Sequence, residues 1–429
     1  MAQICYDNKN TNERQKSKMK IRYPEYYKKF RCIAGACPDT CCAGWEIAVD
    51  RASEKRYREA QRTMENQEFA KKLKKHVKNG CIISEGATCP FLNADGLCEM
   101  YIEMGAESLC HTCARHPRHM EDYGNLHEMV LLLSCPEVAR LILEENSGGF
   151  FVRELPEKSG NMDGIDEELL DILLKTRDIV WKIVKNEDLS VDSRMMLAMA
   201  LVHDVQRRIS RDERIGIPAV LARYERTDAA AQFIQQWESS GKRGCDKECE
   251  HLGADCESTD RFLLMSDFME ELAGLETICS SWPDMLERCR TKLYHSGDSR
   301  EKYMSRRLQF MEMHEPAYAA ADLWCLFQYF TYSFFLSALY DGDALTKMKM
   351  AVLCTMAVEE LYMAQMDDAG NGGAESGTTD IPTIQNRVHI CHALARQIEN
   401  SDTNRSALEQ ILKQEIFCAR RIVNALVGF

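Results

Sequence analysis

The chain contains 429 residues, of which 45% are hydrophobic and 28% are charged, and its net charge is −13. This composition is typical of a globular protein with a large core, and it excludes a disordered or fibrous chain. The acidic surplus lies after residue 135, where 33 Lys and Arg face 49 Asp and Glu; it argues against a nucleic-acid partner, because phosphates require basic side chains.

The first 19 residues are predicted to be a polar N-terminal extension without the apolar segment of a secretory signal. We therefore expect a cytoplasmic protein whose cysteines are kept reduced. In a reducing compartment disulfide bonds are disfavoured, so metal binding becomes the leading role for a dense set of cysteines.

Ten of the 20 cysteines lie between Cys32 and Cys135, and their spacing is ordered. The sequence reads C-x4-C-x3-C-C from Cys32, C-P-F-L-x4-L-C from Cys89 and C-x2-C from Cys110. Thiols at this density pair as disulfides, bind metal or carry redox chemistry. With disulfides disfavoured, we expect these residues to bind metal.

The spacing also bears on the kind of metal. The turn from Cys110 to Cys113 lets two thiolates hold one ion or cluster. The side chains of the adjacent residues Cys41 and Cys42 diverge, so the two rarely bind the same ion. Either one of them is a ligand and the other supports it, or each belongs to one of two neighbouring sites. Zinc and iron–sulfur clusters both accept tetrahedral thiolates, and the surplus of irregularly spaced cysteines favours a cluster. The nearby histidines are expected to be surface or supporting residues: His111, His116, His119 and His127.

Around these cysteines helical signals are few. Ser53 resembles the N-cap of a helix over residues 53–78. Residues 81–119 are rich in Gly, Pro and Cys, as in a loop that metal binding organises. A further helix is predicted over Pro136–Glu145, with proline at its first position. We therefore predict a cysteine-rich metal or iron–sulfur cluster domain over residues 20–146.

From residue 160 onward, apolar residues recur at three- and four-residue steps, which is typical of amphipathic helices. We find no convincing β-α-β alternation, and predict an α-helical domain over residues 160–429 with a linker at residues 368–380. The expected fold class is mainly α: a loop-rich cysteine-cluster metal-binding region packed on a multi-helix α body. The predicted helices are 163–185, 192–210, 218–239, 259–275, 283–294, 298–313, 319–340, 345–366, 383–399 and 404–427.

The segment 319–340 is strongly apolar, and its length is near that of a membrane-spanning helix. It contains Asp322 and Gln328 and lacks flanking clusters of Lys and Arg. A spanning helix needs about twenty uninterrupted apolar residues. We therefore predict a buried core helix and no transmembrane span, with peripheral membrane contact left open.

The cysteines after residue 135 are expected to lie outside the metal site. The group Cys245–Cys256, which includes His251, falls in a polar stretch and is interpreted as an exposed loop. The others are isolated on predicted helices, where thiols behave as small core residues: Cys279, Cys289, Cys325, Cys354, Cys391 and Cys418.

The order of the cysteine motifs resembles that of a known family. C-x4-C-x3-C-C-A-G-W, C-P-F-L-x4-L-C, L-C-x-T-C-x3-P-R and L-S-C-P-E-V-A-R follow one another as in the flagellin lysine-N-methylases of the FliB type. Within them lies a pattern similar to the wider YkgJ-like zinc- or iron-chelating cysteine-cluster region. The opening Lys20–Phe30 and the motif R-Q-I-E-N-S at Arg396–Ser401 also resemble the family, so the likeness spans nearly the whole chain.

The resemblance implies methylation of lysine ε-amines on flagellin with S-adenosyl-L-methionine as the donor. It also implies an iron–sulfur cluster of the [4Fe–4S] type held by the cysteines, with zinc as the alternative. The implied ligand pool is Cys37, Cys41, Cys42, Cys89, Cys98, Cys110 and Cys113. Cys32 and Cys135 match the pattern as well, with a structural role as their alternative, whereas Cys81 falls in no motif of the family.

The catalytic residues and the donor pocket are not identified by the sequence. No G-x-G-x-x-G loop follows a strand, and the C-x3-C-x2-C motif of radical enzymes is absent. A methyl-accepting lysine must lose its proton, which calls for a desolvated channel with a carboxylate or tyrosine. The aromatic stretch 324–340, with Glu312 and Glu315 before it, could supply one, although such stripes are usually core. The alternative function is a non-catalytic zinc- or iron–sulfur-binding protein with a structural, sensing or partner-docking role.

Overall fold

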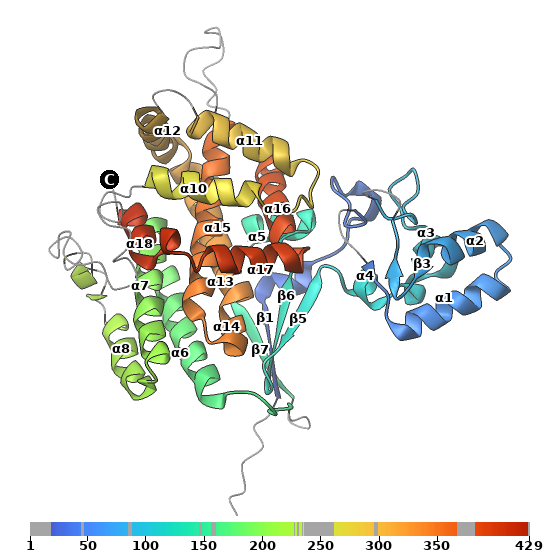
Figure 1. Cartoon of the computed structure of the whole chain (residues 1–429), viewed down its shortest axis with the longest axis horizontal. Helices are drawn as coiled ribbons and strands as arrows, with labels where there is room; N and C mark the ends of the chain where they lie inside the picture. The colour runs from blue at the N-terminus through green and yellow to red at the C-terminus, as the bar shows by residue number, and fades with distance from the viewer. Residues whose placement is uncertain are drawn as a thin grey trace, which may run out of the picture.

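The computed structural model describes residues 19–43, 47–84, 88–145, 148–155, 160–226, 228–229, 231–233, 235, 261–295, 299–366 and 382–427. They form a large helical body with a four-stranded sheet on one side, and a smaller lobe that projects from it (Figure 1). Helices dominate, so the predicted mainly α fold class is confirmed. Residues 1–18, the predicted linker 368–380 and the group Cys245–Cys256 lie outside the described residues.

The sheet joins strands that are far apart in the sequence. Its spatial order is β5-β6-β1-β7, with β1 parallel to β6 and antiparallel to β7, while β5 and β6 form a hairpin. The sequence did not predict this sheet, because its strands are five or six residues long and interrupted by charged residues. The strands are β1 (Met19–Pro24), β5 (Arg118–Asp122), β6 (Leu126–Leu131) and β7 (Phe150–Leu155).

The smaller lobe has a hydrophobic core of its own. Tyr57, Phe69 and Phe91 fill this core together with Cys89 and Cys110. The sheet and α5 belong instead to the core of the helical body. The division between the two cores therefore lies within the segment 20–146, whose domain boundaries remain a prediction. The lobe contains β2 (Ile47–Ala48), α1 (Arg51–Thr63), α2 (Gln67–His76), β3 (Val77–Lys78), β4 (Cys81–Ile82), α3 (Glu99–Met104) and α4 (His111–Arg115).

The predicted helix over residues 53–78 is wrong in two details. The side chain of Asp50, not Ser53, caps the first helix by accepting a hydrogen bond from the Ser53 amide. The helix also ends near residue 64, because the Asn66 side chain accepts a bond from the Phe69 amide and begins a second helix. Asp and Asn are both preferred N-caps, so these two signals were present in the sequence.

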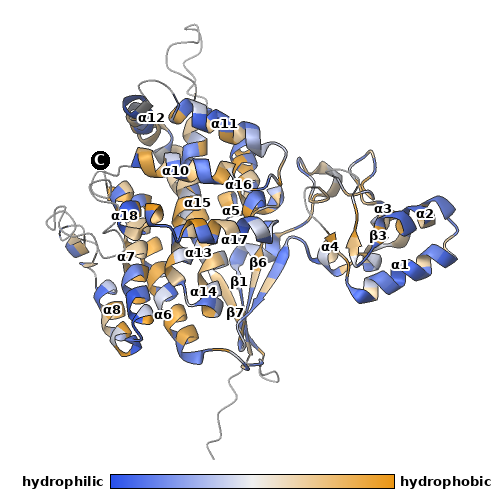
Figure 2. Ribbon diagram, in the orientation of Figure 1, coloured by the Kyte–Doolittle hydropathy of each residue, from blue (hydrophilic) through white to orange (hydrophobic). Residues whose placement is uncertain are grey.

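The helical body is organised around α15 (Ala344–Gln365), which is buried from Ala344 through Ala364. A helix buried on all sides carries apolar residues around its whole circumference. Figure 2 shows α15 largely in hydrophobic colours, whereas α1 and α2 are largely hydrophilic. Helices α7, α10, α11, α13 and α16 pack against it. The other helices of the body are α5 (Pro136–Glu145), α6 (Glu167–Val184), α7 (Val191–Ser210), α8 (Ile217–Tyr224), α10 (Arg261–Ala273), α11 (Trp282–Leu293), α12 (Ser299–Met313), α13 (Ala320–Phe334), α14 (Ala338–Asp341), α16 (Ile384–Glu399), α17 (Asp402–Ile411) and α18 (Ala419–Val427).

The apolar segment 319–340 is a buried core element, as predicted. It contains α13 and α14, joined by a tighter helical turn at Phe335–Ser337, and most of its side chains are inaccessible to solvent. None of the helices in the described ranges is both long and apolar enough to cross a membrane. The predicted helix 404–427 is in fact two helices, α17 and α18, separated near residues 412–418.

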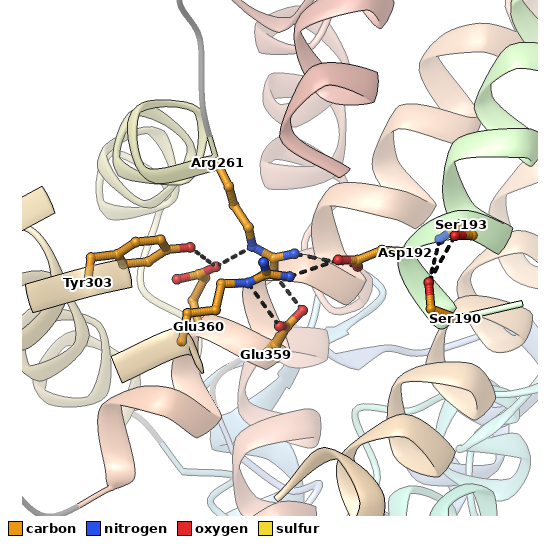
Figure 3. Close-up of polar contacts among 8 residues, drawn as sticks. Ser190, Asp192, Ser193, Arg261, Tyr303, Glu359 and Glu360 are labelled. Carbon is orange, nitrogen blue, oxygen red and sulfur yellow. Dashed lines mark hydrogen bonds and ion pairs between the residues drawn. The ribbon is translucent and has the colours of Figure 1, made fainter. Parts of the chain in front are cut away.

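Two arginines and three carboxylates form a buried ionic network between α7, α10, α12 and α15 (Figure 3). Arg261 donates to Glu359 at 2.5 Å and to Glu360 at 3.0 Å, and it lies 3.5 Å from Asp192. Arg307 donates to the other oxygen of Asp192 at 2.7 Å. Because a buried charge is costly without its partner, this network holds the four helices in one arrangement.

Candidate functional site

The cysteines of the predicted ligand pool fall into two neighbouring groups. The groups meet at the consecutive residues Cys41 and Cys42, which belong to one group each. Burial, with a smaller contribution from neighbouring thiols of the same group, raises the pKa of Cys135 to about 11 and that of Cys89 to about 12. The first group lies on the chain segments that contact the helical body, and the second contributes to the core of the smaller lobe. The first group is Cys32, Cys37, Cys41 and Cys135. The second group is Cys42, Cys89, Cys98, Cys110 and Cys113.

Two pairs of thiols share a hydrogen bond. The bond between Cys41 and Cys42 lowers the pKa of Cys42 to about 7 and raises that of Cys41. Cys110 and Cys113 form the same kind of pair, in which the pKa of Cys110 falls to about 7. In each pair one thiol therefore ionises near neutral pH, and the thiolate is the form that binds metal.

Arg396 of α16 holds the loop that carries most of the first group. Its guanidinium donates to the carboxylate of Asp39 at 2.6 Å and to the backbone oxygens of Thr40 and Ala43 at 3.1 and 2.6 Å. Only 4% of the Arg396 side chain is exposed, so its guanidinium makes these charge-assisted bonds away from water. The arginine thereby fixes the cysteine loop, residues 32–43, against the helical body.

Glu399 lies one helical turn beyond this arginine and holds the segment that carries Cys135. Its carboxylate accepts hydrogen bonds from the Ser134 amide at 2.8 Å and from the Tyr329 hydroxyl at 2.5 Å. Burial raises the pKa of Glu399 to about 7. Helix α16 therefore contacts both chain segments that carry the first group.

Asp50 plays a corresponding role for the second group. Its carboxylate accepts bonds from the Ser53 amide at 2.9 Å and from the His111 amide at 2.9 Å, and the bond from His111 is the largest cause of its lowered pKa. One side chain thus caps α1 and also fixes the turn that begins at Cys110. The backbone amide of Cys89 donates to the oxygen of Cys42 at 2.7 Å, which joins two further members of the group.

The histidines near the cysteines have other partners or are neutral. His119 pairs with Glu121 at 2.7 Å and His127 with Asp122 at 3.2 Å, all on the sheet. Burial and the nearby guanidinium of α16 lower the pKa of His116 to about 4, so this imidazole is uncharged near pH 7.

In the described part of the chain, no three His, Cys, Asp or Glu side chains are placed as the ligands of a single metal ion. The 16 described cysteines carry no disulfide bond. The donor chemistry of the second group fits a thiolate-bound metal, because it contains both thiols whose pKa is lowered, Cys42 and Cys110, in partly buried surroundings. The assignment of individual ligands stays a prediction.

Sequence reasoning missed the residues that position the cysteines. Arg396 and Glu399 stand in the R-Q-I-E-N-S motif, so a signal was present, but nothing local connects this motif with the cysteines. Tyr329 belongs to the aromatic stretch considered for a lysine channel, and the structure places it in the core, bonded to Glu399. Glu312 is exposed on α12.

The helices around this site match a known protein family. Residues 177–423, more than half of the chain, match the model of the FliB lysine N-methylase C-terminal domain. The chain belongs to the FliB lysine N-methylase family. Membership confirms the predicted class, a protein-lysine methyltransferase. The matched region includes Arg396 and Glu399, and it begins after the cysteine-rich segment.

Three relatives from Salmonella share a stretch of 131 residues with the chain, equal to 29% of its length. The flagellar biosynthetic protein FliU of Salmonella muenchen is 34% identical, and the match covers 78% of that protein. Lysine-N-methylases of Salmonella typhimurium and Salmonella choleraesuis are each 33% identical, with 33% of each relative covered. The chain therefore aligns with about a third of these two methylases. No solved structure matches the chain.

Proposed function

We propose that this protein methylates lysine ε-amines of flagellin in the cytoplasm, with S-adenosyl-L-methionine as the methyl donor. Lysine methylation follows from the family, and a flagellar substrate is supported by the name of the relative FliU. The observation that carries the proposal is the set of hydrogen bonds between α16 and the segments that carry the cysteines. Through Arg396 and Glu399, the region that defines the methylase family and the cysteines form one structural unit.

The two cysteine groups would hold an iron–sulfur cluster, for which we propose the [4Fe–4S] type. The proposed ligands come from Cys37, Cys41, Cys42, Cys89, Cys98, Cys110 and Cys113, with Cys32 and Cys135 as further candidates. When bound, such a cluster supplies a redox-active and electrostatic centre. The chain's own residues orient the cysteine loop through Arg396 and cap the Cys110 turn through Asp50.

The lysine to be methylated must be neutral before its nitrogen can accept a methyl group. A lysine side chain in water has a pKa of about 10.4, so the protein must bind it where the charged form is disfavoured. Removal from water has this effect on lysine. The substrate lysine is therefore expected to enter a desolvated site on the helical body.

Methyl transfer from labelled S-adenosyl-L-methionine to flagellin tests the function directly. We expect label on flagellin lysines when the protein is purified without oxygen and retains its metal. Flagellin whose lysines have been chemically dimethylated beforehand is the control and should take up no label. A metal-retaining preparation that transfers no methyl group to lysine would show that the protein instead has a non-catalytic metal-binding role.

Substitution of single cysteines tests the metal site. Cys41→Ser and Cys113→Ser are expected to lower bound metal, because each removes one thiol of a hydrogen-bonded pair. Cys279→Ser is the matched control, since this thiol lies in the core of the helical body and should leave metal content unchanged. Iron, zinc and acid-labile sulfide are measured per chain. Stoichiometric zinc without sulfide would replace the iron–sulfur assignment with a zinc site.

A further inference from the structure

The smaller lobe carries a basic groove on its outer face. The groove has a volume of about 700 Å³ and runs between the exposed side of α1, the end of α2 and the turn between β3 and β4. Its floor includes Val49, Val77 and Gly80, and both residues of the Asn79–Gly80 turn have positive φ, which brings the chain back tightly beside α1. Five cations and one carboxylate line it: Arg51, Arg58, Arg62, Lys74, Lys78 and Glu54.

Most of these cations have no counter-charge. Arg58 pairs with Glu54, but Arg51, Arg62, Lys74 and Lys78 form no ion pair or side-chain hydrogen bond with any described residue. All four are exposed. Residues 47–84 hold ten Lys and Arg against five Asp and Glu, in a chain whose net charge is −13. The groove is therefore a concentrated positive site on an otherwise acidic protein.

The groove is separate from the cysteine site. Helix α1 lies between them, because its opposite side, with Tyr57 and Ala60, packs into the lobe core that contains the second cysteine group. The hydroxyl of Tyr57 donates to the backbone oxygen of Ser108 at 2.8 Å, close to the Cys110 turn. A partner bound in the groove would lie against the reverse side of the helix that supports these cysteines.

We propose that this groove binds an acidic segment of the protein substrate, a proposal that rests on the methylase function. The acidic helical body repels such a segment, so the groove orients an incoming substrate as well as holding it. A single-stranded nucleic acid is the less suitable partner, since such grooves interleave cations with exposed aromatic rings and none lines this groove. The exposed cations also predict binding that weakens as salt rises.

Charge reversal in the groove tests the proposal. In Arg62→Glu/Lys78→Glu, the KM for flagellin is expected to rise about tenfold with little change in kcat, because docking is lost while the chemistry is retained. The control Lys71→Glu/Arg153→Glu makes the same change in net charge at exposed cations outside the groove and should keep the wild-type KM. Equal KM values in the two variants would overturn the proposal.

Binding of a fluorescein-labelled decaglutamate, followed by fluorescence anisotropy, tests whether the groove binds acidic segments, independently of methyl transfer. We expect the wild-type protein to bind this peptide, the groove variant to bind about tenfold more weakly, and the control variant to bind as the wild type does. Labelled oligouridine of equal length is the comparison probe. Tighter groove-dependent binding of oligouridine, or no binding of decaglutamate, would refute the substrate-docking role. A wild type that binds decaglutamate but methylates nothing would refute the proposed function and leave an acidic-segment groove in place.

Discussion

Replacing Arg396 with alanine is expected to weaken metal binding by about 10- to 100-fold and to lower methyl transfer with it, the effect typical of removing a residue that orients metal ligands. The substitution deletes three hydrogen bonds and leaves the Asp39 carboxylate and two backbone oxygens of the cysteine loop without their buried donor. The loop then loses the contact that fixes it against α16. Inductively coupled plasma mass spectrometry measures the metal content per chain. Transfer of labelled methyl groups to flagellin measures the activity.

Arg387→Ala provides the matched control on the same helix. Arg387 donates two bonds to the buried Asp322 at 2.8 and 2.7 Å, so its loss also breaks a buried ion pair. This pair joins α16 to α13, away from the cysteine loop. We expect normal metal content per folded chain in this variant. Hydrogen exchange of residues 37–43 should be faster by about tenfold or more only in Arg396→Ala. An equal loss of metal in both variants would mean that Arg396 acts through general stability.

Arg261→Met is expected to lower the free energy of unfolding by about 3–5 kcal/mol, the cost of stranding buried charges. The side chain is 1% exposed and neutralises Glu359, Glu360 and Asp192, which come from two helices. Methionine retains much of the volume, so the lost charge rather than a cavity dominates. Urea denaturation followed by far-ultraviolet circular dichroism measures the effect, because most of the helical signal comes from the body.

Two further variants separate the ionic network from general effects of substitution. Arg288→Met, at an exposed position of α11, should change stability by no more than about 0.5 kcal/mol. Adding Glu359→Gln to Arg261→Met should cost less than the sum of the single changes, since it removes one of the stranded charges. A loss below about 1 kcal/mol for Arg261→Met, or strict additivity in the double variant, would contradict this account of the network.

Most helices were predictable because their signals are local. Proline at the first position and a glutamate in the first turn mark Pro136–Glu145, and the structure has α5 over the same residues. The single helix predicted over residues 53–78 is wrong because a second local signal lies within it. Asn66 is an N-cap that begins α2 and so divides it from α1. The four-stranded sheet was missed for a different reason. Its strand β1 pairs with β6, about a hundred residues away, and nothing in the sequence of either strand indicates which strand it pairs with.

The candidate site shows the same division between local and distant information. The cysteine motifs and the R-Q-I-E-N-S segment are each recognisable in the sequence, and each resembles the corresponding motif of the family. Their contact could not be predicted, because Asp39 and Arg396 are 357 positions apart in the chain. The adjacent Cys41 and Cys42 are predicted to be either one ligand with a supporting neighbour or members of two neighbouring sites. In the structure their thiols share a hydrogen bond, and the choice between the two stays a prediction.

By itself, the sequence determined the mainly α class, the methylase family and the dense set of thiols, since composition, periodicity and motif spacing are properties of neighbouring residues. Only the tertiary structure decided how these parts combine. It divided the cysteines into two groups, joined them to α16 through Arg396 and Glu399, and left a basic groove on the outer face of α1. The physical reason is that hydrogen bonds, ion pairs and unpaired charges depend on distances in space, and folding alone sets those distances between residues far apart in the chain.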